Sequence, residues 1–204
     1  TIMLSKDEKQ NIAKIKKLIR TRDFEKIEMG IELVRSINNP KIFDELLGNV
    51  EIERGVKFKH DWKGAGPDEH YFQTAILGLL NFSPKGSKGY EIRDSVQNLI
   101  IEGEIKSGYS YVRSKVFLKY LSNFSNLKVL RVENYKEIVG FEEIYNLPIE
   151  DLELDRGYTL PNHEKKWAFK KLKRIIFTLP NSNSTRYTDD PEEKTEPKKM
   201  QGLD

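Results

Sequence analysis

Apolar and charged positions alternate with the period of an α-helix through the first 48 residues. Asp23 is placed to cap a second helix, and Asn39 followed by Pro40 predicts the start of a third, which ends near Gly48. The short connections predict antiparallel neighbours that form a small helical layer. The apolar residues that define the three faces are Ile12, Ile15, Leu18, Ile19, Phe24, Ile27, Ile31, Val34, Ile37, Ile42, Phe43, Leu46 and Leu47.

The pattern changes between residues 49 and 93. A helix is predicted from Asp68 to about Phe82, and the polar run from Pro84 to Gly89 is predicted to be a loop that ends it. Before this helix, apolar positions partly alternate with charged ones, which predicts a strand or hairpin around Gly55. The alternating residues are Val50, Ile52, Val56 and Phe58.

The second half of the chain contains an internal repeat, in which four segments share an L-x-x-L-x-L pattern of apolar positions. The first residues of successive segments lie 31, 22 and 23 positions apart. Apolar residues at intervals of three follow the second segment, and a matching tail follows the first after an insertion of about nine residues. The four segments begin at Val96, Leu127, Ile149 and Leu172.

These segments resemble leucine-rich repeats, and residues 127–148 resemble the short bacterial type. The resemblance covers residues 94–180 and implies a parallel sheet whose concave face binds other proteins. With its helical leader, the chain is similar to small bacterial leucine-rich-repeat proteins. The position that usually holds a ladder-forming Asn or Cys departs from this pattern, so we expect a short, distorted sheet. The residues at that position are Glu104, Tyr135, Gly157 and Pro180.

The predicted fold is α/β, with an N-terminal helical layer packed on a short, irregular leucine-rich-repeat solenoid that contains a parallel sheet. Residues 1–93 form the helical region that caps the solenoid, residues 94–180 form the repeats, and residues 181–204 form a disordered polar tail. The last repeat has no evident cap. The tail, a second copy of the chain or a partner strand are the alternatives for covering it.

Strand alternation identifies a candidate protein-binding face. The residues that flank the second and third consensus apolar positions are expected to point outward and to stack in columns across the strands, which places Glu102, Glu133 and Asp155 side by side. The candidate residues on this face are Ile100, Glu102, Val129, Arg131, Glu133, Asp151, Glu153, Asp155, Arg174 and Ile176.

Two interpretations of this face remain open. It is either an acidic groove that receives a basic peptide or protein surface, with Arg131 and Arg174 setting the orientation, or the solvated sheet face of a highly charged protein. The apolar residues beside the charges favour binding, because interfaces combine apolar anchors with polar surroundings.

Charge and composition narrow the function classes. The 204 residues include 35 Lys and Arg against 32 Asp and Glu, so the net charge of +3 argues against a dedicated polycation or polyanion binder. That small total conceals an acidic sheet face, a basic first helix, a basic stretch over residues 165–174 and an acidic tail. No apolar run approaches the roughly 20 residues that span a bilayer. We expect a cytoplasmic protein with no membrane association, and a removed signal peptide stays open as an alternative.

Signals for chemistry are weak. Cysteine is absent, which excludes disulfides, thiolate metal sites and cysteine nucleophiles. His60, His70 and His163 lack metal-ligand spacing and are expected in surface or loop positions, and residues 85–89 lack the spacing of a phosphate-binding loop. Lysines around Trp167 and Phe169 would suit nucleic acid, but these aromatics fall where repeat-closing apolar residues belong. We therefore expect no enzyme, no cofactor and no metal.

The function that these patterns favour is noncatalytic protein–protein recognition through the concave sheet face. The alternative is a structural protein that self-associates through the uncapped last repeat. Nucleic-acid binding and catalysis are less favoured.

Overall fold

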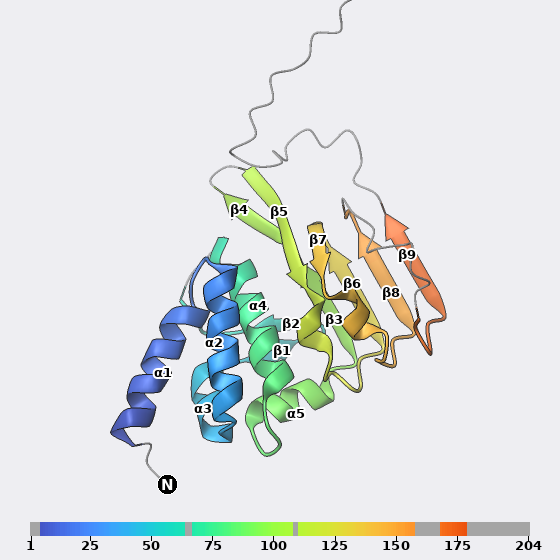
Figure 1. Ribbon diagram of the computed structural model, residues 1–204. Coiled ribbons are helices and arrows are strands. Elements are labelled where there is room, and N and C mark those ends of the chain that lie inside the picture. The colour runs from blue at the N-terminus through green and yellow to red at the C-terminus, as the bar shows by residue number, and fades with distance from the viewer. Residues whose placement is uncertain (1–4, 64–66, 108–109, 158–167, 179–204) are drawn as a thin grey trace, which may run out of the picture.

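The chain is a mixed α/β protein in which a layer of helices lies beside a group of strands (Figure 1). The computed structural model describes residues 5–63, 67–107, 110–157 and 168–178. The helices in these ranges are α1 (Lys6–Ile19), α2 (Phe24–Ile37), α3 (Pro40–Leu47), α4 (Pro67–Phe82) and α5 (Lys88–Ser95). Helix α2 packs against both α1 and α4.

The first three helices are confirmed, and the second and third begin at the predicted caps. The Asp23 carboxylate accepts a hydrogen bond from the backbone N–H of Lys26, and the Asn39 side chain accepts one from the N–H of Lys41. Gly48 ends α3 with a positive φ of 62°, a conformation that glycine adopts without steric cost. One detail differs, because Ile37 is 38% exposed rather than part of the buried face of α2.

The region between α3 and β3 confirms two predictions and corrects a third. An antiparallel hairpin, β1 (Glu51–Glu53) with β2 (Lys57–Lys59), forms around Gly55, and α4 follows as expected. The predicted loop over residues 84–89 is wrong in its last part, because α5 begins at Lys88. The Ser87 hydroxyl accepts a hydrogen bond from the N–H of Tyr90 and so starts a helix within a polar run.

Four parallel strands form the sheet that the repeat predicted. They occur in the order β3 (Asn98–Glu102), β6 (Val129–Glu133), β8 (Asp151–Asp155) and β9 (Arg174–Thr178). Their register is continuous, so three rows cross the strands and match the predicted columns. These rows are Asn98–Val129–Asp151–Arg174, Ile100–Arg131–Glu153–Ile176 and Glu102–Glu133–Asp155–Thr178.

A second sheet lies next to the first. Strands β4 (Glu104–Ser107) and β5 (Ser110–Phe117) form an antiparallel hairpin, and β7 (Tyr135–Val139) pairs parallel with β5. This hairpin occupies the place of the insertion in the first repeat, and the sequence pattern did not predict it. The tails of the first two repeats contain the 3₁₀ helices η1 (Leu118–Leu121) and η2 (Phe141–Ile144), and their apolar residues are buried as the repeat pattern requires.

One core runs from the helical layer into the sheet. The inward residues Leu99, Leu130 and Leu152 are at most 1% exposed, whereas Ile175 at the equivalent position of β9 is 40% exposed. Ile175 lies in the same row as the inward Leu152 but is not buried, as expected for a last repeat that has no evident cap. Phe177 in the same strand is partly buried against the core.

The departure from a ladder of Asn or Cys has a steric explanation at two positions. Tyr135 is fully buried, and its ring fills the space beneath Gly157. A Cβ atom at residue 157 would lie 2.0 Å from Cζ of Tyr135, so only glycine fits there. The large ring of Tyr135 in the second repeat therefore requires glycine at residue 157 in the third repeat.

Several predictions fall outside the described residues. They concern His163, Trp167, Pro180, the first residues of the basic stretch (165–167) and residues 181–204. Of the helices in the described ranges, none combines the length and apolar character needed to cross a membrane.

Candidate protein-binding face

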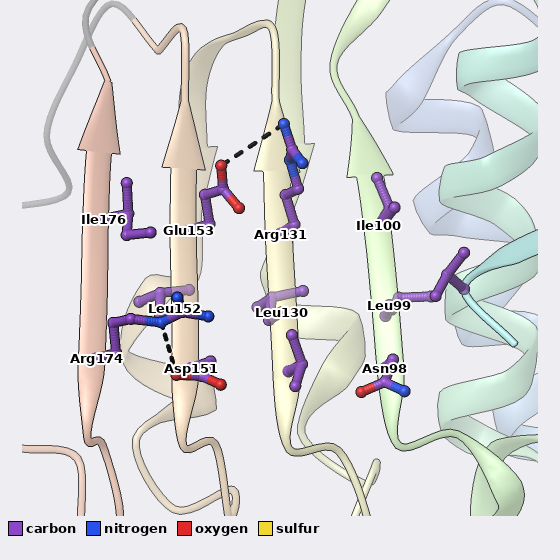
Figure 2. A pocket seen from close by; sticks show the side chains of 12 residues that line it. Asn98, Leu99, Ile100, Leu130, Arg131, Asp151, Leu152, Glu153, Arg174 and Ile176 are labelled. Atoms are coloured by element: carbon purple, nitrogen blue, oxygen red, sulfur yellow. Dashed lines mark hydrogen bonds and ion pairs between the residues drawn. The ribbon is translucent and has the colours of Figure 1, made fainter.

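The outward side chains of the first two rows surround a shallow hollow on the parallel sheet. We call this surface the outer sheet face, and Figure 2 shows its side chains on one side of the four strands. The hollow has a volume of about 280 Å³, and Val56 from the β1–β2 turn also lines it. The row residues around it are Asn98, Ile100, Val129, Arg131, Asp151, Glu153, Arg174 and Ile176.

The structure brings the ten predicted site residues together on four neighbouring strands. Nine are at least partly exposed, as expected. Asp155 is the exception, because it is only 8% exposed and lies beneath two guanidinium groups. The prediction that Asp155 is exposed is wrong, since the guanidinium groups of Arg131 and Arg156 pack against it.

Arg131 pairs with two carboxylates of the row at the end of the sheet and with one of the middle row. Its guanidinium lies 2.6 Å from Glu133, 3.3 Å from Asp155 and 3.6 Å from Glu153. Burial lowers the pKa of Arg131, but these three carboxylates outweigh burial and leave the pKa above its usual value. Arg156 pairs with Asp155 at 3.1 Å and Glu133 at 3.8 Å. Glu133 and Asp155, two of the three carboxylates in the predicted stack, therefore form a closed network with Arg131 and Arg156.

The remaining carboxylates of the face also have cationic partners. Arg174 binds Asp151 across β8 and β9 at 3.0 Å, and Figure 2 shows this pair beside the Arg131–Glu153 pair. Glu102 lies 3.8 Å from Lys57. The outer sheet face consequently presents paired charges rather than a free acidic groove, which weakens the expectation of a strongly basic partner.

Apolar side chains lie on either side of the charge pairs. Val56 lies beside Ile100 at the β3 side, Val129 lies in the first row, and Ile176 lies at the β9 side. Sequence reasoning missed Val56 because its position depends on a long-range contact, in which its carbonyl accepts a hydrogen bond from the N–H of Ile100 at 2.9 Å. It also missed Arg156, which follows β8 with a positive φ of 54°.

His70 joins the helical layer to both sheets. It lies on α4 and is buried, which corrects the expectation of a surface or loop position. Its Nδ1 lies 2.9 Å from the carbonyl oxygen of Glu102, and its Nε2 lies 3.0 Å from that of Lys115. A protonated ring would donate to both carbonyls, but burial is the larger effect and lowers the pKa of His70.

The other described histidine does not form a metal site. Nε2 of His60 lies 3.1 Å from Glu69, and this contact lowers the pKa of Glu69 although burial opposes it. Within the described ranges, no three His, Asp or Glu residues are grouped so that they could hold a metal ion. His60 and His70 instead support the β1–β2 hairpin and the end of β3.

The outer sheet face thus offers apolar contacts and oriented charges on regular strands. Comparisons with family models, with curated proteins and with solved structures find no match for this chain. A function for this face must therefore be argued from its own geometry.

Proposed function

We propose that the parallel sheet belongs to a short leucine-rich-repeat solenoid and that its outer face binds a protein partner without catalysis. The observation that carries this proposal is the continuous register of four repeated segments around one lined hollow. A charged sheet face that only keeps a protein in solution needs neither apolar residues at both sides nor such a hollow.

The middle row supports a specific kind of partner. From β3 to β9, its side chains are apolar, positive, negative and apolar in turn, namely Ile100, Arg131, Glu153 and Ile176. With strands about 4.8 Å apart, the row spans about 14 Å, which four to five extended residues cover. The complementary segment carries apolar residues at both ends and an acidic and a basic residue between them.

Ordered ion pairs favour such binding because they hold their side chains in place before the partner arrives. Arg131 is fixed by three carboxylates, so its remaining surface is presented in one orientation. The apolar residues contribute contact area, and the charges select the partner and its direction. This arrangement replaces the basic partner expected from the sequence with a partner of mixed charge.

The test is selection from a displayed library of random peptides on the immobilised full chain. Selected peptides should bind at least about tenfold more weakly to Ile100→Asp, because the loss of an apolar anchor costs on the order of 1–2 kcal/mol. Leu33→Asp is the matched control, since Leu33 is exposed on α2, away from the sheet.

Two further results decide the proposal. Glu153→Lys should change which peptides are selected, because it reverses the sign of one position in the middle row. Selected peptides that bind wild type, Ile100→Asp and Glu153→Lys equally well would contradict recognition through this face.

A further inference from the structure

The two edges of the parallel sheet differ. At β3, the hydrogen bond between Ile100 and Val56 places the turn of the β1–β2 hairpin against the edge. At β9, the order of strands ends among the described residues, and Figure 1 shows β9 on the side of the sheet away from the helices. An open edge strand presents backbone donors and acceptors that another strand can use.

The hydrogen bonds to β8 show which groups of β9 face this edge. The N–H of Arg174 donates to the carbonyl of Glu150 at 3.0 Å, and the carbonyl of Thr178 accepts from the N–H of Arg156 at 2.8 Å. Successive residues of a parallel strand direct their backbone groups to opposite sides. The N–H and C=O groups of Ile175 and Phe177 therefore point away from β8.

Apolar side chains accompany these backbone groups on both faces of β9. Ile176 on the outer face is 38% exposed, and Ile175 on the inner face is 40% exposed. An exposed edge with apolar side chains on both faces is a surface that folded proteins usually avoid unless another strand covers it.

The sequence of β9 is complementary to itself in one antiparallel register. With a two-fold axis at Ile176, this residue faces its own copy, Ile175 faces Phe177, and Arg174 faces Thr178. The outward groups of Ile175 and Phe177 then exchange hydrogen bonds with those of the second copy. Apolar residues meet apolar residues, and no like charges lie opposite each other.

We propose that β9 pairs antiparallel with β9 of a second copy, so that the two parallel sheets join into one continuous sheet. This dimer does not rest on the proposed binding function, and its test needs no peptide. It uses Ile176 and Arg174, which also line the β9 end of the hollow, and it leaves the part of the hollow between β3 and β8 accessible in both copies. Its symmetry is that of a closed two-fold interface, in which the same strand serves both partners.

Single cysteines test the register directly, because the chain has none of its own. Facing residues on the axis lie about 4.5 Å apart in a non-hydrogen-bonded pair, which is within the Cα separation that a disulfide accepts. Ile176→Cys should therefore form a disulfide-linked dimer under mild oxidation with diamide. Arg174→Cys is the matched control, since its two copies would lie about 13 Å apart along the strands.

The expected result is cross-linking of Ile176→Cys at least about tenfold faster than of Arg174→Cys, as a high effective concentration requires. A mixture of Arg174→Cys and Thr178→Cys should also cross-link, although neither does so alone. Equal cross-linking rates for Ile176→Cys and Arg174→Cys would contradict the proposed antiparallel register.

Mass measurements without oxidation provide a second readout. The wild-type mass should double from 23.8 kDa as the protein concentration rises. Ile176→Lys and Ile176→Glu should each stay monomeric, and their mixture should regain the dimer because opposite charges then face each other on the axis. A wild-type chain whose mass stays at 23.8 kDa at every protein concentration would overturn the proposal. This holds equally if the chain's own tail or an extended peptide is what covers β9.

Discussion

The first and last strands of the parallel sheet carry the same repeat pattern but lie in different surroundings. Leu99 of β3 is 1% exposed and is covered by the rest of the core, whereas Ile175 of β9 is 40% exposed. The Ile100–Val56 hydrogen bond covers the outer edge of β3, and no strand among the described residues pairs with the outer edge of β9. A repeat motif thus specifies the direction of a side chain, and its neighbours determine whether that side chain is buried.

The largest expected effect compares the inward residues of a central and a terminal strand. Leu130→Ala should lower the free energy of unfolding by about 2–5 kcal/mol, because it leaves a cavity in a tightly packed core. Ile175→Ala should lower it by less than about 1 kcal/mol when measured on the monomer at low protein concentration. Denaturant titration measures both values, and equal losses would contradict the difference between the strands.

The charge network allows a second comparison along the same sheet. Arg131→Met should cost about 1–3 kcal/mol, because it leaves the mostly buried carboxylates of Glu133 and Asp155 with fewer partners. Arg174→Met should cost less than about 0.5 kcal/mol, because its pair with Asp151 is exposed to solvent. Thermal unfolding in low and high salt would show the larger and less salt-sensitive loss for Arg131→Met, and the reverse order would contradict a closed network.

The pH dependence of stability tests the link between the helical layer and β3. In the unfolded chain His70 has a pKa of about 6.5, and burial lowers this pKa in the folded state. Between these two pKa values, the unfolded state therefore binds more protons than the folded state. The free energy of unfolding falls as the pH drops through about 6.5, by up to about 1.4 kcal/mol per pH unit, and it levels off below the folded pKa.

His70→Gln should remove this part of the pH dependence, because glutamine keeps a polar side chain near the two carbonyls but does not titrate. Denaturant titration of both proteins between pH 8 and pH 5, a range of about three units around the histidine value, measures the difference in slope. An unchanged slope in His70→Gln would show that His70 does not couple proton binding to folding.

Much of the fold could be predicted because its signals are local. Caps at Asp23 and Asn39 mark helix starts, and the repeat pattern gives the strands and the residues that share a row. The burial of Asp155 and the place of Val56 could not be predicted in this way. They depend on contacts with Arg131 and Arg156 and on a hairpin that lies far from β3 in the sequence.

The candidate site also combines features that the sequence could predict with features that it could not. The pattern correctly grouped the outward residues, but it left open whether the stack of carboxylates is an acidic groove or a solvated charged face. Ion pairs across strands, such as Arg131 with Glu153, depend on side-chain conformations that strand alternation does not determine. The sequence predicted which residues meet, and the structure was needed to show that their charges are already paired.

The most direct test of the account is a measurement of backbone amide chemical shifts in the full chain when a selected peptide is added. We predict shifts in β3, β6 and β8 around Ile100, Arg131 and Glu153, and no shifts in the exposed part of α2 around Leu33. Shifts confined to the helical layer, with an unchanged outer sheet face, would contradict the claim that this face is the binding site.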